Sequence, residues 1–253
     1  MPNRSSSRAE RLDALRAEVR AIESAGRGAA QECLPFGAEA IDRRLAGGGL
    51  AVSALHEAAG VGPDLGDDAA ATLFIAGIAA RLSGTVIWAF CRRDLFAPGL
   101  ALAGLGPDRI IYAECGTDDD VLAVMEEGLR HGGLAAVVGE VGRAAMVSTR
   151  RLQLAAEEGG TMALMLKRWK RADPLAEPSS AMTRWRIGRA PSTPLPVEGV
   201  GRPRWHLDLV RQRGGEPFTL IMEACDAQGR LALPALPRDR PDQADRSEGR
   251  RAA

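Results

Sequence analysis

Four kinds of residue are scarce in this chain of 253 residues, namely aromatics, histidine, cysteine and lysine, and their scarcity limits the structures and chemistry that the chain can have. Aromatic residues make up 4% of the sequence, so the core must consist mainly of Ala, Leu, Val and Ile. Only three histidines occur, and the four cysteines are scattered without a C-x-x-C spacing. This pattern argues against a metal site and favours reduced, mostly buried thiols. Lysine occurs twice, as Lys167 and Lys170, so arginine carries nearly all of the positive charge.

Long apolar segments are also missing. No run approaches the roughly 18 apolar residues of a membrane-spanning helix, and the N-terminus has no apolar signal core. We therefore expect a cytoplasmic protein without membrane contact. Apolar residues nevertheless make up 45% of the chain, which is enough to form the core of one α/β domain with appended tails.

Charge is distributed unevenly, although the formal net charge is zero. Residues 101–160 contain ten acidic and five basic residues, whereas residues 167–213 contain eleven basic and four acidic residues. The basic C-terminal half indicates an anionic partner on one face, although an arginine-rich composition alone would give the same counts.

A strand–loop–helix pattern is the most informative local feature. A short apolar strand over 54–59 leads into a glycine-rich turn, and an amphipathic helix is predicted over 69–82. A working nucleotide-binding loop of this layout needs the motif G-x-x-x-x-G-K-S/T, with Lys on the phosphates and a hydroxyl on Mg²⁺. Here two carboxylates follow the last glycine; they suit a helix N-terminus but would repel a triphosphate. The degenerate loop comprises Gly60, Gly62, Gly66, Asp67 and Asp68.

Two interpretations of this loop remain open at this stage. It is either only a tight turn, or it binds a nucleotide weakly through backbone N–H groups at the helix N-terminus. The neighbouring His56 is expected to be a satisfied core or edge histidine, because no nucleophile or base stands at a suitable spacing from it.

Strands alternate with helices along the rest of the chain. Strands are predicted at 85–90, 109–114, 134–139 and 161–167, and helices at 38–45 and near 94–104, 118–131 and 144–158. Such alternation predicts a mostly parallel sheet with helices on both faces. Further strands at 182–187, 205–211 and 218–224 follow, and the last two form an antiparallel hairpin.

Terminal segments flank this core. Residues 1–33 are predicted to be an N-terminal helix and linker, residues 34–228 the core domain, and residues 229–253 a disordered tail. The helix, over 8–24, carries an apolar stripe that either packs on the domain or docks on a partner. The stripe consists of Leu12, Leu15, Val19 and Ile22.

One segment carries a family resemblance. Its residues are Leu34, Pro35, Phe36, Gly37, Ile41, Asp42, Leu45, Gly48, Gly49, Leu50, Glu57 and Gly60. This segment resembles the entry into the first core strand of RecA-type recombinases. Within that superfamily the chain is most similar to the ImuA family, bacterial damage-inducible mutagenesis proteins sometimes labelled SulA-like or RecA-like. The resemblance spans about residues 34–228 and implies an α/β RecA-like core with C-terminal antiparallel strands.

The resemblance also implies where catalytic residues would lie. The loop lysine and hydroxyl positions fall near Asp67 and Asp68. The position of the water-activating Glu falls near Arg92, and the position of the magnesium-holding Asp falls beside Glu140. Glu140 comes one residue late, so strand alternation turns it to the other face. Because phosphoryl transfer depends on positioning and electrostatics, we expect no catalytic residue, no bound metal, no cofactor and negligible hydrolysis.

A binding role follows from the same resemblance. It implies a non-catalytic accessory protein of SOS-induced mutagenesis and translesion DNA synthesis. The implied partners are an ImuB-like Y-family protein and an error-prone C-family DNA polymerase, with RecA and single-stranded DNA as further partners.

A basic segment would supply the contacts, because cations neutralise phosphates and an indole stacks on bases. The candidate residues are Lys167, Arg168, Trp169, Lys170, Arg171, Arg184, Arg186, Arg211 and Arg213. The alternative is a solvated strand end with the indole against the sheet.

Two other functions stay open on the sequence alone. One is an ATP-binding RecA/KaiC-type ATPase with a divergent loop. The other is a SulA-like cell-division inhibitor, although inhibitors of that type are shorter and need no basic region at 167–213.

Overall fold

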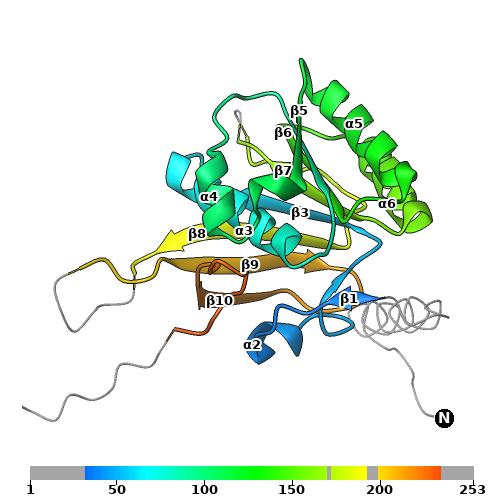
Figure 1. Cartoon of the computed structure of the whole chain (residues 1–253). Helices are drawn as coiled ribbons and strands as arrows, with labels where there is room; N and C mark the ends of the chain where they lie inside the picture. The colour runs from blue at the N-terminus through cyan, green and yellow to red at the C-terminus, as the bar shows by residue number, and fades with distance from the viewer. Residues whose placement is uncertain (1–31, 170–171, 193–198, 235–253) are drawn as a thin grey trace, which may run out of the picture.

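The computed structural model describes residues 32–169, 172–192 and 199–234 (Figure 1). The predicted N-terminal helix with Leu12, Leu15, Val19 and Ile22 lies outside these residues, as do Lys170, Arg171 and the segment 235–253. In chain order the elements are β1 Cys33–Leu34, α2 Glu39–Asp42, β2 Leu50–Ala51, β3 Leu55–Gly60, α3 Leu65–Ala80, β4 Val86–Phe90, α4 Ala97–Leu102, η1 Pro107–Arg109, β5 Ile110–Glu114, α5 Asp118–His131, β6 Ala136–Val141, α6 Met146–Gly159, β7 Met162–Lys167, β8 Thr183–Ala190, β9 Arg204–Gln212 and β10 Phe218–Glu223.

A single large sheet forms the centre of the described part. Its strand order is β10-β9-β8-β3-β7-β6-β4-β5, and the strands from β8 to β5 run parallel to one another. Strands β8, β9 and β10 pair antiparallel at the other end, as the hairpin prediction required. The short strands β1 and β2, which the sequence pattern did not predict, form a separate antiparallel pair.

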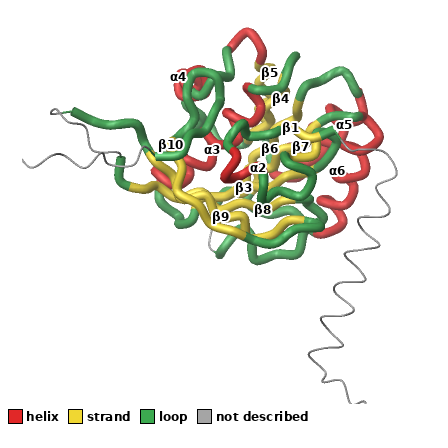
Figure 2. The backbone as a smooth tube through the Cα atoms, turned by 90° about the horizontal axis from the view of Figure 1, so that it is seen from below, coloured by secondary structure: helices red, strands yellow, loops and turns green. Residues whose placement is uncertain are grey.

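Helices cover both faces of the sheet. Figures 1 and 2 show α3 and α4 on one side and α5 and α6 on the other. Two core clusters correspond to these sides: one contains Phe74, Trp88 and Trp185 beneath α3, and the other contains Met125 and Leu152 beneath α5 and α6. The predicted fold class, α/β with a mostly parallel sheet and C-terminal antiparallel strands, is confirmed.

Helix α3 differs from its prediction in start and in character. It begins at Leu65 rather than Ala69, because the Asp64 carboxylate accepts hydrogen bonds from the backbone N–H groups of Gly66 and Asp67 and caps the first turn. The helix is also not a surface helix with one apolar face. Most of its alanines, together with Phe74 and Ile75, are buried between the sheet, α4 and the C-terminal segment.

Other boundaries follow local signals to different degrees. Helix α5 spans the predicted residues because a capping box of Thr117 and Asp120 starts it and Gly132, with φ of 69°, ends it. Helices α2 and α4 are shorter than predicted, β6 begins and ends two residues later than predicted, and β8 extends further toward its C-terminal end.

The ordered domain also continues beyond 228. Leu231 is buried in the core, and Ala232 bridges to Glu223, so the boundary at 228 is too early. None of the helices in the described ranges combines the length and apolar character that a membrane crossing needs.

Candidate functional site

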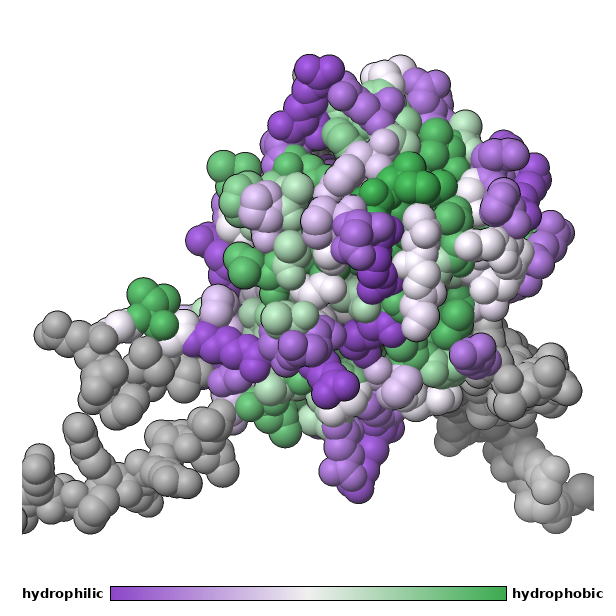
Figure 3. Space-filling view, viewed as in Figure 1, coloured by the Kyte–Doolittle hydropathy of each residue, from purple (hydrophilic) through white to green (hydrophobic). Residues whose placement is uncertain are grey.

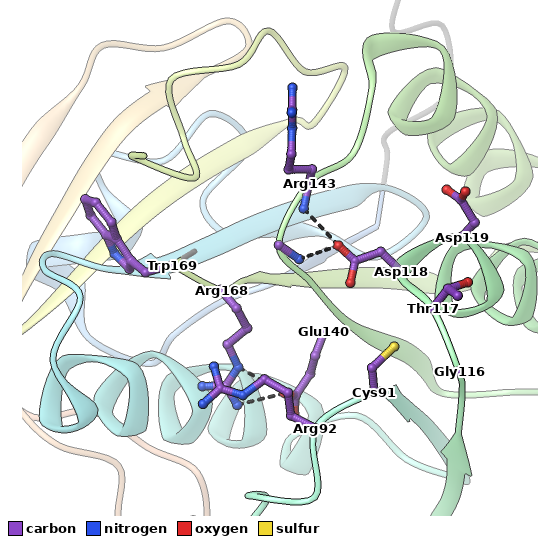
Figure 4. Close-up of a pocket in the computed structure, with 11 residues that line it drawn as sticks. Cys91, Arg92, Gly116, Thr117, Asp118, Asp119, Glu140, Arg143, Arg168 and Trp169 are labelled. Carbon is purple, nitrogen blue, oxygen red and sulfur yellow. Dashed lines mark hydrogen bonds and ion pairs between the residues drawn. The ribbon is translucent and has the colours of Figure 1, made fainter. Parts of the chain in front are cut away.

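The carboxyl ends of β3, β4, β6 and β7 meet at one edge of the sheet, where open α/β folds place their ligands. After β4 the chain continues to α4 on one face of the sheet, and after the neighbouring strand β6 it continues to α6 on the other face. The connections that follow these two adjacent strands therefore lie on opposite faces. A cavity of about 530 Å³ lies here, and its walls include Arg92, Asp118, Arg143 and Trp169 (Figure 4). The degenerate loop after β3 lies at the same edge.

The N–H groups at the start of α3 are already occupied. Asp64 Oδ1 accepts hydrogen bonds from Gly66 N at 2.8 Å and from Asp67 N at 3.1 Å. These N–H groups, together with Arg189, lower the pKa of Asp64. The Asp68 N–H donates to the Asp64 carbonyl, and the Val61 N–H donates to Ile187. A phosphate would therefore have to displace internal acceptors that the loop itself supplies.

Arg189, in strand β8, holds the loop from outside. Its backbone N–H donates to Asp67 Oδ1 at 2.9 Å, and its guanidinium pairs with Asp64 at 2.9 Å. A Cβ atom at Gly66 would lie 2.3 Å from Arg189 Nε, so this glycine makes room for an arginine. The sequence did not single out Arg189, because its partners lie more than a hundred residues away.

A buried guanidinium lies at the predicted catalytic positions. Arg168 donates from Nη2 and Nε to Glu140 Oε2 at 2.7 and 3.0 Å, and its Nη1 lies 3.5 Å from Asp68 Oδ2. The Trp88 indole donates to Glu140 Oε1 at 2.7 Å. Glu140 therefore points to the α3 side of the sheet, whereas a Cβ atom at Gly139 would meet Met125 of α5. The alternation is as expected, but it turns Glu140 toward Asp68. Burial raises the pKa of Asp68, and Arg168 opposes this shift.

Trp169 is half-buried beside the loop. Its Nε1 donates to the Gly60 carbonyl oxygen at 2.9 Å, which fixes one edge of the indole to the end of β3. The nitrogen-bearing edge of the indole therefore lies against the sheet, as in the alternative to a nucleic-acid contact.

Burial removes three residues from the predicted basic surface. Lys167 is 1% exposed and Arg168 and Arg184 are each 7% exposed, so their prediction as surface contacts is wrong in this structure. Arg184 Nε pairs with the buried Glu57 at 2.7 Å, directly across the β3–β8 ladder. The predicted alternation is correct, since Trp185 points into the opposite core beneath α3. Periodicity identified the face, but it could not identify Glu57 as the partner.

The other predicted cations are bonded to the connection between β7 and β8. Arg186 pairs with Asp173, Arg211 Nη1 donates to the Ser179 carbonyl at 2.7 Å, and Arg213 Nη2 lies 3.5 Å from the Ser180 carbonyl. The structure thus brings Arg186, Arg211 and Arg213 together through one connection. In the β3–β8 ladder Arg186 lies opposite Ala59, one residue before the degenerate loop.

Two arginines of the cavity wall were not predicted as contact residues. Arg143 follows β6, and its backbone N–H and that of Gly142 donate to Asp118 Oδ2 at 3.3 and 3.0 Å (Figure 4). Arg92 follows β4 and pairs with Asp94. Their position directly after two parallel strands is the signal that would have identified them.

His56 is a satisfied core residue, as expected. Its ring nitrogens lie 2.7 Å from Thr183 Oγ1 and 2.9 Å from the Ala51 carbonyl oxygen. Burial lowers its pKa to about 4, so the ring is neutral at pH 7. Within the described residues, no group of three or more His, Cys, Asp and Glu side chains could hold a metal ion.

Comparisons with known proteins identify relatives of the chain. No family model matches it. A solved structure, SulA from Pseudomonas aeruginosa, is 22% identical, with a TM-score of 0.39, and the match covers 46% of this chain and 98% of that chain. Protein ImuA of Caulobacter vibrioides, from strains NA1000 / CB15N and ATCC 19089 / CIP 103742 / CB 15, is 38% identical over 205 residues. The match covers 77% of this chain and 84% of the relative, and the chain therefore belongs to the ImuA family.

Proposed function

We propose that this protein is a non-catalytic accessory factor of damage-induced mutagenesis, which binds proteins and DNA and performs no phosphoryl transfer. Membership of the ImuA family supports the mutagenesis role. One observation supports the absence of catalysis: the Arg168 guanidinium is buried between Glu140 and Asp68 at the positions where a metal and a phosphate would be needed.

The physical reason is electrostatic. Phosphoryl transfer requires cations and donors that point at an empty phosphate site. Here the cation is already paired with two carboxylates, and the N–H groups of α3 donate to Asp64. Binding ATP would require breaking a buried ion pair, which is strongly unfavourable. The two acidic residues at the start of α3 would add repulsion.

We further propose that the chain bridges an ImuB-like Y-family protein and an error-prone C-family polymerase during SOS-induced translesion synthesis, with RecA and single-stranded DNA as further contacts. Apolar side chains suited to protein contact are exposed around α3 and α4, namely Leu65, Phe96 and Leu102. Figure 3 shows apolar residues gathered among hydrophilic ones on this face.

Two measurements test the proposal. The purified full chain is incubated with Mg²⁺ and ATP, and we expect no turnover above a protein-free blank. Micromolar ATP affinity with measurable hydrolysis would overturn the non-catalytic assignment. In the second measurement the tagged chain is mixed with the purified Y-family-like protein and the C-family polymerase. We expect all three proteins to elute together. The bridging role would be overturned if the tagged chain retained neither the Y-family-like protein nor the C-family polymerase.

A further inference from the structure

The connection between β7 and β8 crosses the α6 side of the sheet without forming a helix. Its last residues are firmly anchored: Ser179 Oγ donates to the buried Glu57 at 2.6 Å, and Ser180 N donates to Thr149 Oγ1 of α6 at 3.1 Å. Ala181 is fully buried in the core beneath α5 and α6. Opening of this connection must therefore be confined to the residues before Ser179.

Residues 172–178, here named the acidic strap, are held at their centre by the buried Pro174 and Leu175, and their two carboxylates are held by ion pairs. Glu177 Oε1 accepts from Arg143 Nη2 at 2.6 Å and from Arg143 Nε at 2.9 Å. Asp173 pairs with Arg186 in β8. The Arg143 side chain is 80% exposed and Glu177 34% exposed, and the second pair is 28% and 31% exposed. Pairs that are this accessible to water contribute little to stability, so another anion can replace them.

The charges around the strap favour an anion when it opens. Arg143 and Arg186 touch its two carboxylates. With the carboxylates in place these four groups sum to zero, and with the carboxylates displaced the two guanidinium groups leave a charge of +2. A cavity of about 410 Å³, lined by Arg143 and the strap residues Asp173 and Glu177 among others, gives an anion a point of entry.

We propose that the acidic strap shields a binding surface for single-stranded nucleic acid, formed by Arg143 and Arg186, and that backbone phosphates displace the carboxylates of Asp173 and Glu177. This inference rests on the DNA contact in the proposed function and specifies its site. A guanidinium fork that now grips a carboxylate fits a phosphate equally well. Trp169, at the start of the same connection, is half-exposed and offers a ring face near the phosphates. That combination favours nucleic acid over an acidic peptide.

The test neutralises the strap without changing its shape. The full-length variant Asp173→Asn/Glu177→Gln is titrated into a fluorescent oligo-dT at several salt concentrations. Freeing two cations should steepen the slope of log K against log salt by about 1.4 and raise the affinity on the order of 25-fold near 0.1 M salt. The matched control is Asp108→Asn/Glu127→Gln, which makes the same charge change at exposed positions in η1 and α5. We expect the control to gain less than about threefold.

Further variants separate the alternatives. Adding Arg143→Ala to the strap variant should remove at least half of the gain in log K. Thermal melting followed by circular dichroism checks that each variant is folded. If the double variant is unstable, the single variant Glu177→Gln, which changes the more exposed ion pair, is used in its place. The inference is overturned if the strap variant binds oligo-dT like the wild type, or if the control gains equally. It is also overturned if poly-glutamate outcompetes oligo-dT for the strap variant.

The same samples distinguish this inference from the proposed function. If the wild type captures the polymerase relatives but the strap variant gains no DNA affinity, only the strap inference is wrong. If the wild type captures neither relative while the strap variant gains DNA affinity, the bridging role is wrong and the strap inference stands.

Discussion

Replacing Arg168 with methionine tests the buried network at the strand ends. Methionine keeps much of the side-chain volume but removes the guanidinium that pairs with Glu140 and approaches Asp68. Glu140 is 4% exposed and Asp68 is 7% exposed, so neither carboxylate can recover full hydration. Removing one partner of a buried pair costs about 3–5 kcal/mol. Glu140 keeps the hydrogen bond from Trp88, so we expect the free energy of unfolding to fall by about 3 kcal/mol, at the lower end of this range.

Urea unfolding measures the effect. The midpoint should fall while the m-value stays constant, since the surface exposed on unfolding is unchanged. The control is Arg93→Met, which removes an exposed ion pair. The Arg93 side chain is 80% exposed and that of its partner Glu114 is 49% exposed. This change should alter stability by less than about 0.5 kcal/mol.

A compensated variant identifies the cause of the loss. Arg168→Met combined with Asp68→Asn and Glu140→Gln contains no unpaired charge and keeps an acceptor for Trp88, so it should recover most of the stability. If Arg168→Met costs less than about 1 kcal/mol, the pair is solvated and the site is open to water. If the compensated variant does not recover, unpaired charge is not the cause. Either result would refute the reasoning.

Three more predictions follow from single contacts. Burial lowers the pKa of His56 from 6.5 to about 4, so between these pH values the unfolded state binds the proton more readily than the folded state. The free energy of unfolding should therefore decline by about 3 kcal/mol as pH falls from above 6.5 to 4. Urea denaturation at each pH should show a shallower decline for His56→Gln, and an identical decline would contradict the assignment. Asp64→Ala should cost about 1 kcal/mol in urea midpoint analysis by removing the α3 cap, whereas Asp64→Asn should cost less. Gly77→Ala places a Cβ atom 2.3 Å from Cys225 Sγ, so it should lower stability by about 1–3 kcal/mol, and Cys225→Ala in the same chain should relieve part of this loss; wild-type stability of Gly77→Ala would show that the core yields freely.

Local patterns predicted those parts of the fold that local chemistry controls. The alternation of apolar strands and helices predicted the parallel sheet, because buried strands need helices on both faces. Helix α5 has the predicted bounds, 118–131, and its capping box and C-terminal glycine are what fix them. The start of α3 was misplaced because Asp67 and Asp68 were assigned to the loop, whereas the cap at Asp64 was not recognised.

The candidate site was predictable in outline only. The missing lysine and hydroxyl after Gly66 are visible in the sequence, and so is the cluster of cations from Lys167 onward. Which cations face solvent was not visible, because periodicity assigns a residue to a face and does not name its partner. The pairs of Arg184 with Glu57 and of Arg168 with Glu140 depend on strand neighbours set by the sheet order.

The sequence by itself determined the fold class, the loss of the phosphate-binding motif and the basic character of the C-terminal half, because these depend on composition and short-range spacing. Only the tertiary structure decided what replaced the lost motif: Arg168 lies between two carboxylates, and Asp64 and Arg189 occupy the loop. It also decided that Glu177 pairs with Arg143 and that Asp173 pairs with Arg186. The reason is that burial and ion pairing between distant residues are set by the packing of strands, and no local pattern records them.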